Sequence, residues 1–215
     1  MNTKRDSPLE IQGVGVSPGT VYGPAFVIHK RSLQIEPRAL PPQRVAAEIE
    51  RFRLAVENAK HQIEALRKRV AEMLHESHAR IYDAHLAMLD DEALYHKTIQ
   101  FIRDEAFTAD YAFDRCVKRL AERFAQVNDP YLKARGADLE DVCQRVMNNL
   151  MDLEQEPLYE INSPVVIVAR DLTPSDTANM IGRPILGFVT DYGGPTSHAA
   201  IMAKALEIPA VVGAD

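Results

Sequence analysis

One histidine stands where a glycine-rich loop is expected to turn into a helix. Residues 193–198 read Gly-Gly-Pro-Thr-Ser-His, and an alanine-rich run follows. Adjacent glycines tolerate positive φ and proline fixes its own φ, so this stretch predicts a tight loop. The small residues of 199–206 predict a helix that can pack closely on a sheet. His198 is therefore predicted to lie at the amino end of that helix.

This position gives His198 a defined chemistry. The first N–H groups of a helix lack intrahelical partners, and the helix dipole makes that end a phosphate-binding site. The same field disfavours an imidazolium ion, which keeps a ring nitrogen available as a nucleophile. Gly194, Thr196 and Ser197 would cradle the phosphate, with Thr196 or Ser197 capping the helix. We predict a histidine that accepts a phosphoryl group; a merely capping or packing histidine is the alternative, and no metal site is expected here.

Short apolar runs on both sides of the loop predict the strands that position it. They cover 165–169, 185–190 and 210–212, and two more strands are expected within 9–28, around the turn signal Ser17-Pro18-Gly19. Residues 173–176, Thr-Pro-Ser-Asp, have capping-box spacing with proline at the first helical position, which predicts a short helix to residue 181. Alternation of strands and helices implies a right-handed α/β layer.

The middle of the chain has a helical pattern instead. Apolar residues spaced alternately by four and three from Val45 to Met73 predict one long helix. Further helices are expected over 79–89, from the acidic run 90–92 onward, over 109–127 with Thr108 as N-cap, and over 131–153. The predicted fold class is α/β plus α. An α/β domain of residues 1–36 and 157–215 would carry an inserted antiparallel helical bundle of residues 37–156.

The composition of the chain argues against several classes of function. The 215 residues carry a net charge of −6, which disfavours a general nucleic-acid binder. No apolar run of about 18 residues predicts a membrane span, and the polar amino terminus lacks the apolar core of a signal peptide. Both cysteines fall in helical patterns and are expected to be small core residues. These features predict a cytoplasmic protein without membrane insertion.

The stretch from Gly193 to Gly213 resembles the phosphohistidine signature of the PEP-utilising enzymes. That family includes enzyme I of the sugar phosphotransferase system, PEP synthase and pyruvate phosphate dikinase. The resemblance to enzyme I extends over nearly the whole chain, through 84–92, 107–110, 131–138 and 171–178. It implies a phosphohistidine swivelling α/β domain in which His198 is phosphorylated through Nε2. It also implies that Thr177 hydrogen-bonds the active histidine.

The same resemblance implies a partner. In enzyme I the inserted bundle docks the small phosphocarrier HPr. The docking candidates carried over position by position are Glu76, His85, Asp91 and Arg135. This chain departs from the family at Pro195, where arginine is common, and at Ser77 and Ala93, where acids are common.

Each docking candidate also has an ordinary structural alternative. His85 could pack on a helix face, Asp91 could only favour a helix start, and Arg135 could be an exposed charge. A negative bundle surface would in any case steer a carrier that has a basic face.

Enzyme I proteins add further strands and helices and then a C-terminal barrel that binds PEP and Mg²⁺ and dimerises. Because no such sequence follows Asp215, we expect an amino-terminal fragment that needs no cofactor itself. The full enzyme would move phosphate from PEP to His198 and then to HPr, and the fragment would perform only the second step, reversibly. Two alternatives stay open: a swivelling domain of a PEP synthase or dikinase, and a binding-only regulatory module. Sugar uptake and nitrogen-related regulation are both compatible pathways.

Overall fold

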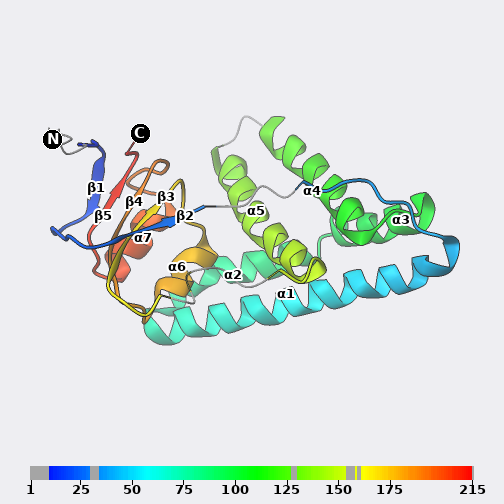
Figure 1. Cartoon of the computed structure of the whole chain (residues 1–215), viewed down its shortest axis with the longest axis horizontal. Coiled ribbons are helices and arrows are strands. Elements are labelled where there is room, and N and C mark those ends of the chain that lie inside the picture. Colours follow the sequence, from blue (N-terminus) through cyan, green and yellow to red (C-terminus); the bar gives the residue numbers. More distant parts are fainter. Residues whose placement is uncertain (1–9, 30–33, 127–129, 154–157, 159–160, 215) are drawn as a thin grey trace, which may run out of the picture. The chain divides into compact units, whose positions relative to one another are not determined.

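The computed structural model describes residues 10–29, 34–126, 130–153, 158 and 161–214. Two compact units make up the chain (Figure 1). The α/β unit consists of Met1–His29, Ile161–Leu172 and Gly182–Asp215, and the helical unit consists of Lys30–Glu160 and Thr173–Ile181. The predicted fold class, α/β plus α, is confirmed.

The α/β unit is built on a five-stranded sheet with the order β1-β5-β4-β3-β2. The three strands predicted around the histidine loop are present with the expected bounds: β3 Val165–Ala169, β4 Ile185–Thr190 and β5 Ala210–Val212. Neighbouring strands from β2 to β5 run parallel, and β1 pairs with β5 antiparallel. The helix α7, His198–Ala205, connects the parallel neighbours β4 and β5, because parallel strands need a crossover connection.

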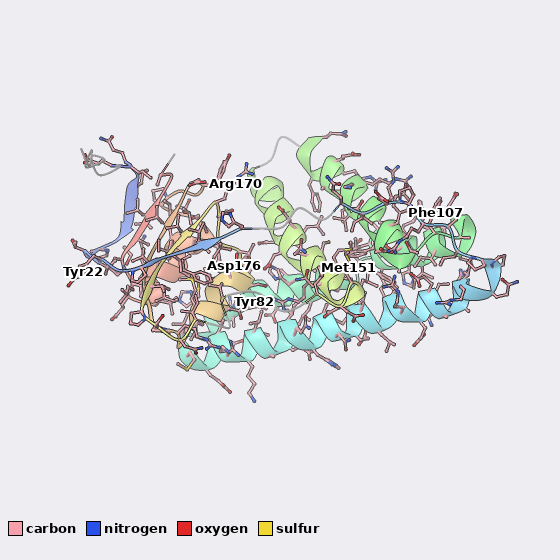
Figure 2. All side chains as sticks on the ribbon, viewed as in Figure 1. Tyr22, Tyr82, Phe107, Met151, Arg170 and Asp176 are labelled. Atoms are coloured by element: carbon pink, nitrogen blue, oxygen red, sulfur yellow. The ribbon has the colours of Figure 1, made fainter. Side chains whose placement is uncertain are left out.

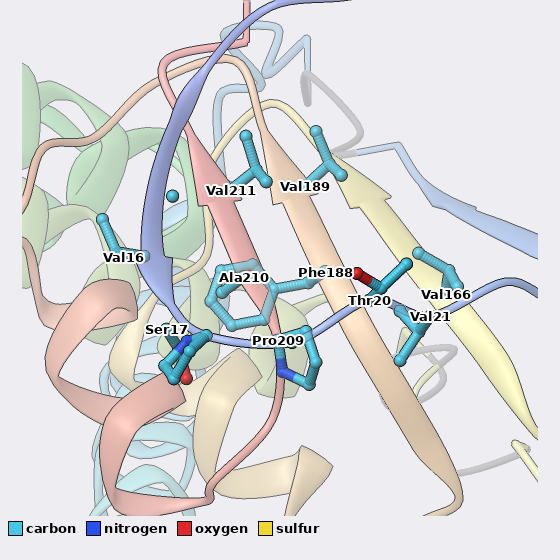
Figure 3. A pocket seen from close by; sticks show the side chains of 13 residues that line it. Val16, Ser17, Thr20, Val21, Val166, Phe188, Val189, Pro209, Ala210 and Val211 are labelled. Carbon is cyan, nitrogen blue, oxygen red and sulfur yellow. The ribbon is translucent and has the colours of Figure 1, made fainter.

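The two strands expected within 9–28 lie at opposite edges of this sheet. They are β1 Val14–Ser17 and β2 Ala25–Ile28. The connection between them, including the Ser-Pro-Gly turn signal, runs across the face of the sheet instead of joining two adjacent strands (Figure 3). The crossing is close, because a Cβ added at Gly187 would lie 3.0 Å from Val21 and a Cβ added at Gly19 would lie 2.5 Å from the Pro209 ring. A hollow of about 580 Å³ with mostly apolar lining lies beside the crossing.

The helical unit follows the predicted apolar periodicity. A short 3₁₀ turn, Pro42–Arg44, leads into the long helix α1, Val45–Met73. The remaining helices are α2 Glu76–Leu89, α3 Tyr95–Glu105, α4 Ala109–Gln126, α5 Pro130–Leu150 and α6 Pro174–Met180. Helix α1 packs against all five of them. Its buried stripe includes Phe52, Val56, Ala59, Ile63, Leu66 and Val70.

Contacts that the sequence pattern does not predict are found at two helix starts. The acidic run 90–92 does not begin a helix, because the Asp91 carboxylate accepts a hydrogen bond from the N–H of Ala93 at 2.8 Å and the chain turns before α3. Helix α4 begins directly after Thr108, as predicted. Its first N–H, on Ala109, donates to the carboxylate of Glu48 on α1 at 2.7 Å. A distant glutamate thus supplies an acceptor at this helix start.

Helix α6 shows where sequence order and packing differ. The pattern placed residues 157–215 together in the α/β domain, and α6 lies between β3 and β4 in the chain. In the structure Thr173–Ile181 groups with the helical unit, because α6 packs on α1 and α5. Among the described helices, none is both long and apolar enough to span a membrane.

Candidate active site

His198 is the first residue of α7. Ser197 is the N-cap residue, with extended backbone, and its Oγ accepts a hydrogen bond from the N–H of Ala200 at 3.2 Å. The first intrahelical bond runs from the N–H of Ile201 to the Ser197 carbonyl at 3.1 Å. The predicted helix start is therefore confirmed, and His198 lies at the positive end of the helix dipole.

The loop before His198 is shaped by its backbone. Gly193 has φ +113°, which side-chain-bearing residues rarely adopt, and a Cβ added there would lie 3.3 Å from Ser197 Oγ. The N–H of Ser197 donates to the Gly194 carbonyl at 2.9 Å, which closes the turn into the helix. Thr190 Oγ1 donates to the Tyr192 carbonyl at 2.7 Å, where the loop leaves β4. A glycine and short-range hydrogen bonds thus set the approach to His198.

This loop leaves the carboxyl edge of the parallel strands. The N–H groups of Asp191 and Tyr192 donate to the carbonyls of Ala169 and Arg170, at 3.2 and 2.9 Å, so the chain after β4 is bonded to the chain after β3. The Arg170 guanidinium lies over the Tyr192 ring, 5.0 Å from its centroid, and its Nη2 donates to the tyrosine hydroxyl at 3.2 Å. Ligands of open α/β sheets bind at this edge. The histidine loop therefore occupies the position where such sheets carry their chemistry.

The parts of the loop suit an anion better than a cation. Helix-end N–H groups and the hydroxyls of Thr196 and Ser197 can donate to phosphoryl oxygens. Across the described residues, no group of three or more His, Cys, Asp or Glu side chains is arranged to hold a metal ion. A histidine at this edge can act as a nucleophile toward phosphorus, while the helix end stabilises the charge of the transferred group.

Thr177, the predicted hydrogen-bond partner of His198, lies on α6 in the helical unit. Its Oγ1 lies 3.0 Å from the carbonyl oxygen of Pro174 and 3.2 Å from that of Thr173. His198 belongs to the α/β unit. The hydrogen bond between Thr177 and His198 therefore stays a prediction.

Two of the docking candidates lie on the surface of the helical unit. Glu76 is exposed at the start of α2, and its carboxylate accepts from Arg67 Nη2 at 2.5 Å. Asp91 is exposed in the turn before α3. Both carboxylates are placed where a partner could reach them. The side chain of Arg135 lies outside the described residues.

The fourth candidate, His85, lies inside the helical unit. Its side chain is 1% exposed, and its ring packs edge-on against Tyr82 with centroids 5.6 Å apart. Its Nε2 is 3.8 Å from Asp138 Oδ1. His85 is thus a buried side chain in the structure, and its docking role stays a prediction.

The sequence pattern does not predict a polar network that surrounds the start of α6. Tyr82, Asp141 and Arg145, on α2 and α5, hydrogen-bond the first turn of α6. One residue of this network is unusual in the sequence: Asp141 is an acidic residue next to the apolar face of α5, between Leu139 and Val142. Periodicity marks such a residue as unusual but does not name its partner.

Comparison with known proteins gives two family matches. The model of the N-terminal region of PEP-utilising enzymes matches residues 12–135, and the model of their mobile domain matches residues 161–215. Phosphoenolpyruvate-protein phosphotransferases from Bacillus sp. (strain S) and Geobacillus stearothermophilus are each 40% identical over 203 residues, and that from Buchnera aphidicola is 32% identical. These matches cover 94% of this chain but 35% of each relative, so the chain spans about a third of their length.

Two solved structures are also similar. A solution structure of Enzyme I (nEIt) superposes with a TM-score of 0.77 at 40% identity, covering 95% of this chain and 83% of the other. The N-terminal domain of Enzyme 1 - Nitrogen superposes with a TM-score of 0.67 at 29% identity, covering 96% and 84%.

Proposed function

The chain belongs to the family of PEP-utilising enzymes, and from this premise we propose that it is a phosphoryl carrier of the PEP-dependent phosphotransferase system. His198 Nε2 takes up the phosphoryl group and passes it to a histidine of an HPr-type carrier. The main support for this proposal is the position of His198. It is the first residue of α7, and it follows a glycine turn at the carboxyl edge of the sheet. Relatives at 40% identity named phosphoenolpyruvate-protein phosphotransferase support the same activity.

The transfer to the carrier is an in-line displacement. A ring nitrogen of the carrier histidine attacks phosphorus as the bond from phosphorus to His198 Nε2 breaks, and the electron pair of that bond returns to the His198 ring. Little covalent activation is needed, so positioning and charge stabilisation supply most of the rate. The positive end of α7 faces charge that spreads over the phosphoryl oxygens in the transition state.

The helical unit is the proposed docking surface. Exposed carboxylates such as Glu76 and Asp91, on a chain of net charge −6, favour a carrier with a basic face and speed its encounter. His85 and Arg135 are proposed as docking residues from the same resemblance; His85 is buried, and the side chain of Arg135 lies outside the described residues.

Uptake of phosphate from PEP is proposed only for a longer protein. The chain spans 35% of its curated relatives, and the PEP site with its Mg²⁺ is expected in their remaining part. Similarity to Enzyme I structures supports this carrier role over a PEP synthase or dikinase domain.

Replacing the proposed nucleophile tests the function directly. His198→Ala should lower the rate of phosphate exchange with phosphorylated HPr by roughly a thousandfold or more, because no other group can replace the attacking nitrogen. The same variant should still bind HPr in a calorimetric or NMR titration, because docking is assigned to the helical unit. His61→Ala, at an exposed position of α1, is the matched control and should exchange phosphate normally. Full exchange by His198→Ala would refute the proposal.

A further inference from the structure

Arg170 and Tyr192 form a stacked pair where the histidine loop leaves the sheet. Arg170 directly follows β3, and Tyr192 lies two residues after β4, at the carboxyl edge of both strands (Figure 2). The guanidinium carbon lies 5.0 Å from the centroid of the tyrosine ring, and Nη2 donates to the tyrosine hydroxyl at 3.2 Å. The ring face and the hydroxyl thus hold one guanidinium at two points.

The backbone beneath this pair is also fixed. The N–H of Tyr192 donates to the Arg170 carbonyl at 2.9 Å, and Thr190 Oγ1 donates to the Tyr192 carbonyl at 2.7 Å. Thr190 is fully buried, whereas Tyr192 is 54% exposed. An exposed arginine ordinarily samples many rotamers, so stacking and hydrogen bonding on a fixed base restrict the directions that this charge can take.

The pair adjoins the amino end of α7. Gly193 follows Tyr192, and a Cβ added at Gly193 would lie 3.3 Å from Oγ of Ser197, the N-cap residue. Because consecutive Cα atoms are about 3.8 Å apart, the Cα of Tyr192 lies within about 9 Å of that oxygen. Arg170, Tyr192 and His198 all belong to the α/β unit.

The loop that carries the reacting histidine has no formal positive charge of its own. From 192 to 203 the sequence contains neither lysine nor arginine. Helix-end N–H groups and hydroxyls can donate to an anion, but each of them is neutral. Two exposed carboxylates, Asp171 and Asp191, flank the stacked pair in the sequence. A phosphoryl group adds roughly two further negative charges, which these carboxylates disfavour and a guanidinium offsets.

We propose that Arg170 stabilises the phosphoryl group on His198 electrostatically, and so raises the share of phosphate that the chain holds at equilibrium with its carrier. Tyr192 is a positioning residue, because it acts only through the guanidinium. The inference rests on the proposed function. It gives the pair a role beyond bracing the loop, because a brace would act equally on the free and the phosphorylated chain.

The test is the phosphorylation equilibrium between the chain and HPr. The chain is mixed with phosphorylated HPr at neutral to alkaline pH, and intact-mass spectrometry gives the fraction of phosphate on each protein. Arg170→Gln keeps hydrogen-bonding groups but removes the charge. It should lower the equilibrium constant for phosphate on the chain by roughly three- to tenfold, the size expected of one guanidinium near a phosphoryl dianion at a partly exposed site. Protein concentrations below those at which the two proteins associate keep docking out of this constant.

Salt separates charge from structure. From about 0.1 M to about 1 M salt the difference between the wild type and Arg170→Gln should shrink to less than about twofold, because the Debye length falls from about 10 Å to about 3 Å. Tyr192→Ala should act in the same direction by less. In the Arg170→Gln background it should change the constant by less than about 1.5-fold, because the group through which it acts is gone.

Arg183→Gln is the matched control. It makes the same change of residue type and net charge in the same unit, but Arg183 precedes β4 by two residues. The length of that strand separates it from the loop by roughly 20 Å, so the equilibrium should stay as in the wild type. Thermal unfolding shows whether each variant is folded, and if Arg170→Gln is not, Tyr192→Ala at both salt concentrations decides.

The outcomes separate this inference from the proposed function. A wild-type chain that takes no phosphate from HPr would overturn the proposed function and the inference with it. If the wild type is phosphorylated on His198 and Arg170→Gln shares its equilibrium constant, the inference alone is wrong. An equal shift in Arg183→Gln, or a shift that salt leaves unchanged, would assign the effect to net charge or to loop structure and would also overturn it.

Discussion

The loop before His198 and the first turn of α6 are fixed by opposite means. From Gly193 to His198 the loop is held by a left-handed glycine and by hydrogen bonds between residues a few positions apart, and it is bonded to the segment after β3 only where it leaves β4. The turn of α6 is held by side chains that lie 34, 30 and 92 residues from their partners. A locally determined structure tolerates changes elsewhere in the chain, whereas a long-range network depends on the packing of the whole helical unit. The two regions should therefore respond to different substitutions.

A substitution in the core of the helical unit should have the greatest effect on stability. Phe52 is fully buried on α1, and its ring lies 5.6 Å from that of Phe113 and 5.7 Å from that of Tyr95, between centroids. Phe52→Ala should lower the free energy of unfolding of the helical unit by about 3–5 kcal/mol, through lost burial and a cavity. Urea unfolding with hydrogen-exchange mapping measures the loss.

The same experiment shows whether the α/β unit is independent. Hydrogen-exchange protection of β3 and β4 should fall much less than that of α1. Leu54→Ala is the control on the same helix, because Leu54 is 57% exposed and should cost little. Equal loss of protection in both units would contradict the contrast between them.

Two adjacent glycines of the loop before His198 should differ in how much an alanine substitution lowers stability, and this effect is smaller. Gly193→Ala forces a side chain into φ +113° and places its Cβ 3.3 Å from Ser197 Oγ, so it should cost about 1–3 kcal/mol of stability in the α/β unit. Gly194→Ala is matched in chemistry, and its added Cβ meets nothing within 4 Å. It should be close to neutral in a thermal unfolding measurement. Equal melting temperatures for the two variants would argue against a backbone-determined loop.

The smallest effect is a pH dependence confined to the helical unit. Burial acts to raise the pKa of Glu48, but hydrogen bonds from Arg51 and from the Ala109 N–H outweigh it and hold the pKa below its usual value. A lowered pKa contributes stability that is present above the unfolded value of about 4.3 and is lost as the pH falls through the folded value. The helical unit should therefore lose stability progressively below about pH 4.

Glu48→Gln should flatten that acid dependence, because the glutamine does not titrate. Glu57→Gln removes an exposed carboxylate of the same helix and should leave the pH profile as in the wild type. Unfolding free energies at pH 7, 5, 4 and 3 make the comparison. If the unfolding free energies of the wild type and of Glu48→Gln fall equally with pH, Glu48 is not a cause of the acid sensitivity.

The contrast also explains which parts of the molecule could be predicted from its sequence. Strands β3 to β5, the long helix α1 and the N-terminal position of His198 follow from periodicity and turn chemistry, which act within a few residues. The crossing of Gly19 over the sheet, the burial of His85 and the assignment of α6 to the helical unit depend on contacts between distant segments. The same holds for Asp141, whose acceptor role becomes visible only when α5 meets α6. Local rules place His198 at a helix start, and tertiary packing selects the groups that hold the first turn of α6.

Peptide-mapped mass spectrometry shows directly whether His198 carries the phosphoryl group. The chain is incubated with phosphorylated HPr at neutral to alkaline pH, which preserves phosphohistidine, and is then digested and mapped. We expect one phosphoryl group, located on His198, that returns to unphosphorylated HPr when the carrier is supplied. A folded chain that stays unlabelled, or that carries its label on another residue, would rule out the proposed role of His198.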